Sequence, residues 1–115
     1  MDLTGVTDSK FVLLYDNLGG PVTVAAFANP DSLNSLTILA DIRDDAGALL
    51  ATDSIVLPAL GHTAFVLTDR FPITANRRGS IHFNATPQGF TGLGLRFSPF
   101  GTFTSFRLLT SKDIQ

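Results

Sequence analysis

The 115-residue chain contains no cysteine, no tryptophan and no glutamate. Without cysteine it has no disulfide, no thiolate metal ligand and no cysteine nucleophile. Lysine occurs only at positions 10 and 112, and glutamine only at 88 and 115. Because glutamate, lysine and glutamine commonly fill the exposed faces of helices, this composition argues against a helical fold.

Charge is also scarce, since 16% of the residues are charged and the net charge is −2. Apart from Arg77 and Arg78, the basic residues are scattered singly. No basic stripe could therefore follow a phosphate backbone, and we expect no nucleic-acid partner. No run approaches the roughly 18 apolar residues of a membrane-spanning helix, so we expect no membrane insertion.

The chain has the length of a single domain. We expect one domain over residues 1–115, with the polar ends 1–9 and 111–115 frayed. The first ten residues have neither the basic nor the apolar region of a signal peptide. Because methionine opens a polar lead-in, we interpret the chain as a module excised from a longer protein.

Threonine, valine, isoleucine and phenylalanine are plentiful, and these residues favour strands. Residues 36–43 alternate apolar and polar side chains, the pattern of a half-buried strand. Asp44–Gly47 then predicts a tight turn, because aspartate accepts local backbone hydrogen bonds and glycine tolerates positive φ. Similar runs between turn residues predict seven to eight strands, at 11–16, 22–29, 36–43, 49–57, 62–67, 80–86, 90–98 and 102–109.

The stretch 68–72 breaks this alternation. Thr68 is a candidate cap for a single helical turn that Pro72 would end, and we interpret the turn as a crossover between two sheets. The spacing of strands and turns predicts an all-β fold. It is expected to be a two-sheet antiparallel β-sandwich, immunoglobulin-like, with one short helical turn near 68–72.

Residues suited to catalysis are few. A serine hydrolase needs a nucleophile on a strained turn with a histidine base, and no Gly-x-Ser-x-Gly occurs. His62 and His82 fall on separate predicted strands, and we interpret both as solvent-facing. The run 92–97 lacks the third glycine of a dinucleotide fingerprint; glycine in a strand more often lets a ring or another backbone lie close. We therefore expect neither enzymatic activity nor a cofactor.

One acidic cluster, formed by Asp41, Asp44 and Asp45, is dense enough to consider as a metal site. Carboxylates and carbonyls at such a turn are the ligands that calcium prefers. The alternative is a solvated hairpin turn, which we favour, so no metal is expected and these three aspartates are weak calcium candidates.

Five of the ten phenylalanines fall within the seventeen residues 90–106. In strands of period two they cannot all point inward, so some could form an exposed contact patch. The alternative, which we favour, is that they pack into the core. The candidate patch residues are Phe97, Phe100, Phe103 and Phe106, with Phe100 at a turn.

Several short runs are similar to a known kind of module. They are 43–49, 52–58, 61–63, 65–67, 71–72, 78–81, 93–97 and 101–105, of which Leu-Gly-Leu-Arg-Phe and Gly-Thr-Phe-Thr-Ser are the least generic. Together they resemble uncharacterised immunoglobulin-like β-sandwich modules of extracellular proteins of soil bacteria. The resemblance implies a secreted or cell-surface parent protein and no catalytic residues, although the lack of cysteine fits a cytoplasmic protein equally well.

We therefore expect a non-catalytic module that acts as a structural spacer or as a protein-contact or adhesion domain. One alternative is a carbohydrate-binding accessory module, against which the lack of tryptophan and the single tyrosine, Tyr15, count. The other is a protease inhibitor that presents the loops Asn17–Pro21 and Ala75–Gly79. The expected partner is another protein, a carbohydrate, or a second copy paired at the strand Phe11–Asp16. That strand is apolar on both faces, so we expect either a dimer or a covered edge.

Overall fold

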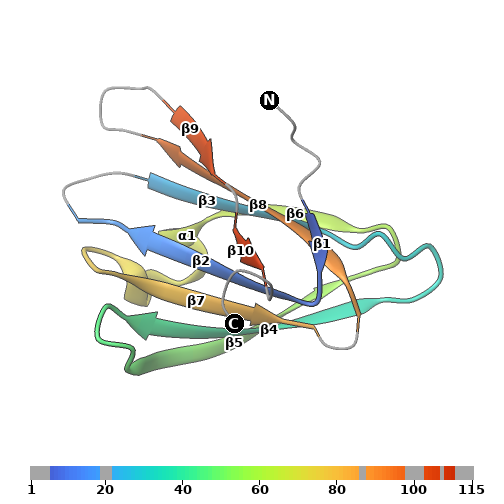
Figure 1. Cartoon of the computed structure of the whole chain (residues 1–115), viewed down its shortest axis with the longest axis horizontal. Coiled ribbons are helices and arrows are strands. Elements are labelled where there is room, and N and C mark those ends of the chain that lie inside the picture. The colour runs from blue at the N-terminus through green and yellow to red at the C-terminus, as the bar shows by residue number, and fades with distance from the viewer. Residues whose placement is uncertain (1–5, 19–21, 86–87, 98–102, 107, 111–115) are drawn as a thin grey trace.

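Two antiparallel sheets lie face to face in the computed structural model, which describes residues 6–18, 22–85, 88–97, 103–106 and 108–110 (Figure 1). Sheet I contains, in spatial order, β1 (Val6–Asp8), β8 (Phe90–Phe97), β3 (Val22–Ala28) and β6 (His62–Val66), with β9 (Phe103–Phe106) also paired to β8. Sheet II contains β10 (Leu109–Thr110), β2 (Lys10–Asp16), β7 (Arg78–Asn84), β4 (Leu36–Asp44) and β5 (Leu49–Leu57). The predicted two-sheet antiparallel β-sandwich is confirmed.

The chain passes repeatedly from one sheet to the other. Among the described strands, only the hairpins β4–β5 and β8–β9 join neighbours within a sheet. In an immunoglobulin constant domain the first two strands are neighbours in one sheet, whereas here the first two strands, β1 and β2, lie in opposite sheets. The likeness to immunoglobulins is therefore one of architecture rather than of strand order.

The core follows from strand alternation. On β4 the inward residues Leu36, Ile38, Ala40 and Ile42 are buried and the residues between them are not. Phenylalanine rings from both sheets meet at the centre of this core. The ring-centroid distances are 4.8 Å for Phe11–Phe90, 5.7 Å for Phe27–Phe90 and 4.6 Å for Phe27–Phe83. Burial of each ring stabilises the fold by about 1.5–3 kcal/mol.

The crossover near 68–72 is confirmed, but its details differ from the prediction. Helix α1 (Leu67–Arg70) follows β6 directly, with Val66 at its N-cap and no side-chain cap. Thr68 is therefore not a cap. Leu67, predicted to end a strand, begins the helix because its side chain is drawn into the core, where it is fully buried.

Helix α1 ends before Pro72, as expected, and Pro72 also begins a second helical turn. The 3-10 helix η1 spans Pro72–Thr74 and leads toward β7 in sheet II. Proline suits the first position of a helix because the amide hydrogen that it lacks has no partner there.

The periodicity missed the two shortest outer strands. β1 has three residues and lies within the stretch 1–9 that we expected to fray, while β10 has two. β10 pairs with β2 at Phe11 and Val12. The β2 edge is therefore covered at those residues, one of the two outcomes expected for it.

Candidate functional site

The outer face of sheet I is apolar. Ala25 and Phe27 of β3 are buried between the sheets, so Val24, Ala26 and Ala28 point outward. The strand register then defines the apolar face, which consists of Val22, Val24, Ala26, Ala28, His62, Ala64, Val66, Thr91, Leu93, Leu95 and Phe97. None of these described residues carries an aspartate, lysine or arginine side chain.

The residues of the apolar face stand in cross-strand rows. Ala26 lies between Leu93 of β8 and Ala64 of β6. In the next row Val24 lies between Leu95 and Val66, and in the row on the other side Ala28 lies between Thr91 and His62. The larger side chain is therefore a leucine of β8 in the Ala26 and Val24 rows and His62 of β6 in the Ala28 row.

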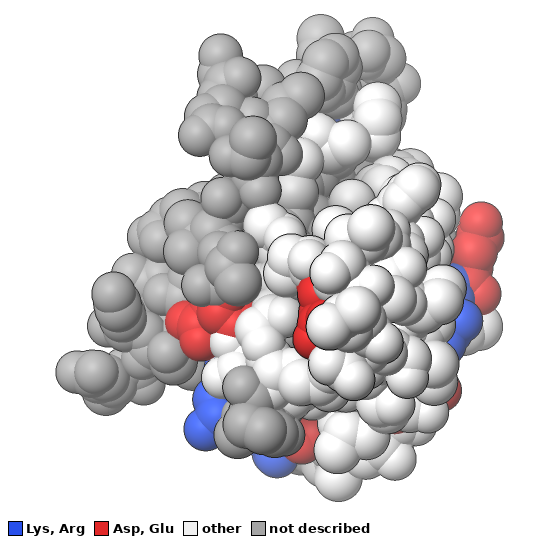
Figure 2. Space-filling view, turned by 90° about the vertical axis from the view of Figure 1, so that its right-hand side faces the viewer, with Lys and Arg blue, Asp and Glu red and all other residues white. Residues whose placement is uncertain are grey.

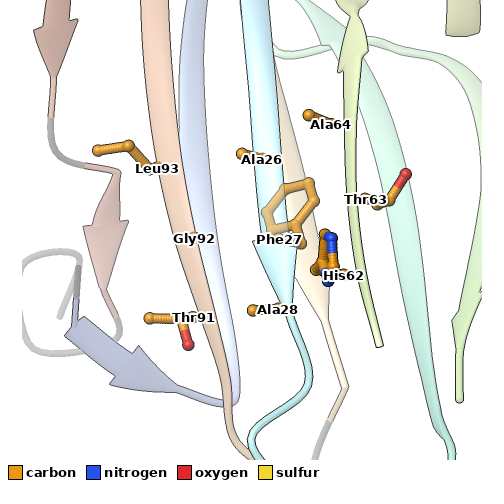
Figure 3. Close-up of a pocket in the computed structure, with 9 residues that line it drawn as sticks. All are labelled: Ala26, Phe27, Ala28, His62, Thr63, Ala64, Thr91, Gly92 and Leu93. Atoms are coloured by element: carbon orange, nitrogen blue, oxygen red, sulfur yellow. The ribbon is translucent and has the colours of Figure 1, made fainter. Parts of the chain in front are cut away.

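A shallow hollow of about 260 Å³ opens on this face (Figure 3). Its floor is made of small side chains, those of Ala26, Ala28 and Ala64. Figure 3 shows Leu93 and Thr91 on the β8 side and His62 on the β6 side. The hollow therefore has an apolar floor with a few hydrogen-bonding groups at one end.

The floor rests on the aromatic core. A side-chain carbon added to Gly92 would lie 2.9 Å from Leu108 Cδ1 and 3.1 and 3.2 Å from two carbons of the Phe27 ring. The interpretation that a strand glycine in the run 92–97 lets a ring lie close is confirmed for Gly92. The backbone beneath the hollow is thus held by close packing.

Sheet II presents a different outer face. There the exposed leucines Leu14 and Leu39 are separated by charged residues at the outward positions. The charged residues are Lys10, Asp16, Asp41, Arg43 and Arg78. In the end-on view of Figure 2, most of the described surface is nevertheless uncharged.

A second hollow, of about 370 Å³, lies on this charged face, and Lys10, Leu39, Asp41, His82 and Asn84 are among the residues that line it. It mixes a cation, an anion and neutral hydrogen-bonding groups with apolar surface. This arrangement suits a polar ligand better than an apolar one.

The two histidines lie on separate strands, as predicted, and these strands belong to different sheets, so the two side chains cannot act together. His82 Nε2 is 3.4 Å from the Ser80 hydroxyl, and Asp41 is its cross-strand neighbour. No hydrogen bond joins Asp41 to His82, although a catalytic triad requires the carboxylate to orient the ring. The arrangement is that of exposed polar residues on one sheet face.

The structure separates the three candidate calcium ligands. Asp44 Oδ1 accepts hydrogen bonds from the backbone N–H groups of Ala46 and Ala48, both at 2.9 Å, so it serves its own turn. Asp45 Oδ2 lies 3.6 Å from Arg78 Nε. Asp41 is an odd number of positions from Asp44 on the same strand, which puts them on opposite faces. Within the described ranges, no three histidine or acidic side chains gather as metal ligands would.

The predicted phenylalanine patch is placed only in part. Phe97 is half-buried on the apolar face opposite Val22. Phe100 lies outside the described residues. Phe103 and Phe106 belong to β9, where they pair with Phe97 and Gly94, but their side chains are outside the described part of the chain.

The two loops considered for protease inhibition lie next to each other. Asn17 is buried, its side-chain amide donates to the Thr74 carbonyl at 2.9 Å, and its backbone N–H donates to the Arg77 carbonyl at 2.9 Å. Residues 19–21 of the first loop lie outside the described residues.

Sequence reasoning missed the apolar face itself. The signal available was the strand 22–28, in which only Thr23 is polar and both faces are apolar. Such a run is typical of a strand that is covered on both sides.

Comparison of the chain with protein-family models, with curated proteins and with solved structures gives no significant match in any of the three. Across the described ranges, neither helix has the length and apolar character needed to cross a bilayer.

Proposed function

We propose that this chain is a non-catalytic β-sandwich module that binds another protein through the apolar face, within a secreted or cell-surface parent protein. The observation that carries the proposal is the uncharged outer face of sheet I. Antiparallel sheets commonly have one face in the core and a polar face in water. The outer face of sheet II exposes Leu14, Leu39 and Val56 but places charged residues among them, whereas the described residues of the apolar face carry no Asp, Lys or Arg.

A contiguous apolar patch on a soluble protein usually marks a contact surface. The core of a protein–protein interface is depleted in charged residues, as the apolar face is. The extracellular setting is supported by the sequence resemblance alone. A spacer role is compatible with the same contact, since neighbouring modules of one protein can dock through such faces.

Site-specific photo-crosslinking tests the proposal. A photoreactive residue at position 64, on the apolar face, is expected to crosslink the chain to protein when it is incubated with secreted proteins of a soil bacterium or with itself. The matched control places the same residue at position 52, which is exposed on the outer face of sheet II. Equal crosslinking at both positions, or none at 64, would overturn the proposal.

A carbohydrate-binding role is the second candidate, and the hollow on sheet II supports it. Lys10, Asp41, His82 and Asn84 offer donors and acceptors for sugar hydroxyls around the apolar side chain of Leu39. Glycan-array binding that is lost in His82→Ala and kept in Ala64→Lys would support this role. The absence of any binding would end it.

A further inference from the structure

We infer that the partner of the apolar face is a second copy of this chain, bound face to face about a two-fold axis. This inference depends on the proposed function, because it names the occupant of the same surface. It is carried by two features of the face: its relief and its lack of charge.

The relief of the apolar face is self-complementary. Leu93 projects from β8 beside the hollow, whose floor is formed by Ala26 and Ala28 of β3 and Ala64 of β6. Leu93 is the ridge and this floor is the trough, while in the next row Leu95 stands beside Val24. Adjacent strands are about 4.8 Å apart, so ridge and trough lie side by side.

A two-fold axis that lies in the interface and runs along the strands, midway between β8 and β3, exchanges these positions between copies. Because it keeps each row at the same height along the strands, it would place Leu93 of each copy over Ala26 of the other, with Thr91 over Ala28 and Leu95 over Val24. Isologous contacts need this kind of self-complementary surface, and stacked sheets pack about 10 Å apart with interdigitated side chains.

The lack of charge removes the main obstacle to self-contact. When a surface meets its own copy, a charge near the axis meets its like, and such juxtapositions cost several kcal/mol. The described residues of the apolar face carry no aspartate, lysine or arginine. His62 lies on β6, two strands away from the proposed axis in the order β8-β3-β6, so the two imidazoles are not opposed.

The charge pattern also separates this occupant from others. An anionic lipid surface or an acidic protein would be recognised by basic residues, which the apolar face lacks. A foreign apolar segment would fit the trough, but it would have no use for the adjoining ridge. Only a partner with a ridge of its own beside a trough uses both features.

Sedimentation equilibrium of the full chain tests the inference. The expected species at high micromolar concentration has twice the 12.3 kDa mass of one chain. Ala26→Lys is expected to give a monomer, because it puts a charge on β3, directly beside the proposed axis. Thr37→Lys, at an exposed position on the outer face of sheet II, is the matched control and is expected to remain dimeric.

An exchange of ridge and trough makes the test specific. Leu93→Ala removes the ridge and Ala26→Leu fills the trough, so each alone is expected to raise the dimer Kd about tenfold or more. The double variant restores a ridge beside a trough with the two positions exchanged, and its Kd is expected to return toward that of the natural chain. Circular dichroism confirms that each variant is folded.

The outcomes separate the inference from the proposed function. A chain that stays monomeric up to about 1 mM, the concentration that corresponds to about −4 kcal/mol, overturns the second-copy inference. So does a dimer that survives Ala26→Lys, or a double variant no better than the single ones. If a monomeric chain still crosslinks to a foreign protein through position 64, the proposed function stands; if it crosslinks to nothing, both fall.

Discussion

At the scale of single residues, the tightest point in the sandwich is Gly79 of β7. It pairs with Tyr15 on one side and Asp44 on the other. A side-chain carbon at this position would overlap the Arg43 carbonyl oxygen and lie 2.8 Å from the Asp44 carbonyl carbon. The glycine is thus needed for a close approach of two backbones rather than for an unusual φ.

Gly79→Ala is therefore expected to lower the free energy of unfolding by about 1–3 kcal/mol, the usual cost of forcing an extra carbon into a packed site. Urea denaturation gives the measurement. Ser80→Ala is the control, because its side chain points outward from the next position of the same strand. A Gly79→Ala chain as stable as the Ser80→Ala chain would show that the two backbones can separate without cost.

Tyr15 is the residue whose environment changes its titration. Its hydroxyl donates a hydrogen bond to the Arg43 carbonyl at 2.8 Å. Burial raises the pKa of the phenol above its ordinary value of 10.0, and Asp44 and Asp45 add to the rise while Arg77 opposes it. The folded chain therefore keeps the phenolic proton at a pH where the unfolded chain has begun to lose it.

This difference makes stability depend on pH in the alkaline range. The contribution is fully present below a pH of about 10, where both states are neutral, and it is lost as pH rises through the raised pKa of the folded state. We expect the natural chain to lose stability more steeply than Tyr15→Phe between about pH 9 and about pH 11. At neutral pH, Tyr15→Phe should itself cost about 1 kcal/mol through the lost hydrogen bond. Parallel pH profiles for the two chains would show that the phenol is not perturbed.

At the scale of elements, β5 is the strand whose free edge needs protection. It lies at the end of sheet II, and the polar groups of an exposed edge can pair with another chain. Asp53 Oδ1 accepts the Ser54 backbone N–H at 2.8 Å, and Arg70 Nη2 of α1 donates to the Ser54 carbonyl at 2.9 Å. An ion pair of 3.2 Å between Arg70 Nε and Asp53 Oδ2 joins the two side chains that bind the backbone groups of Ser54.

Arg70→Ala is expected to promote aggregation through β5, because it frees the Ser54 carbonyl at the middle of the edge. Stability should fall by less than about 1 kcal/mol, since the Arg70–Asp53 pair is substantially exposed. Light scattering during incubation near the midpoint of thermal unfolding gives the measurement. Arg78→Ala breaks the other exposed ion pair, with Asp45, without touching an edge carbonyl, and is the control. Equal scattering by the two variants would exclude a protective role for Arg70.

The elements also show how far the sequence predicts this fold. β4 was predicted almost to the residue, because one face is buried and the other meets water, which produces strict alternation. β1 and β10 are too short for any alternation to appear. The end of β6 was misplaced because Leu67 suits a strand by type, whereas the crossover to the other sheet requires it to begin a helix.

A sequence pattern can mark β3 as apolar on both sides but cannot reveal the rest of the apolar face. This face is formed by β3, β6 and β8, which are far apart along the chain and become neighbours only through the strand order. The alternation within each strand identifies two faces but does not say which strands share a sheet. The outward rows, such as Leu93–Ala26–Ala64, depend on the register between strands, and that is fixed by the whole fold.

At the scale of the whole molecule, the two outer faces differ in charge. Lysine, arginine and aspartate side chains keep the outer face of sheet II hydrated, while the outer face of sheet I offers apolar surface for contact. With a net charge of only −2, two copies repel each other weakly at long range. Contact through the apolar face should therefore depend on burial of apolar area rather than on ion pairs.

The response of the dimer to salt tests this origin of the contact. Raising sodium chloride from about 0.05 to about 0.5 M shortens the electrostatic screening length about threefold. The dimer Kd should nevertheless change by less than about threefold. Sodium sulfate should lower the Kd, because it strengthens apolar burial. The residual self-association of Ala26→Lys should instead improve with sodium chloride, since screening relieves the repulsion between its two added charges. A natural dimer that weakens tenfold over the same range of sodium chloride would show that charged residues hold it together, and the contact would then have to involve sheet II.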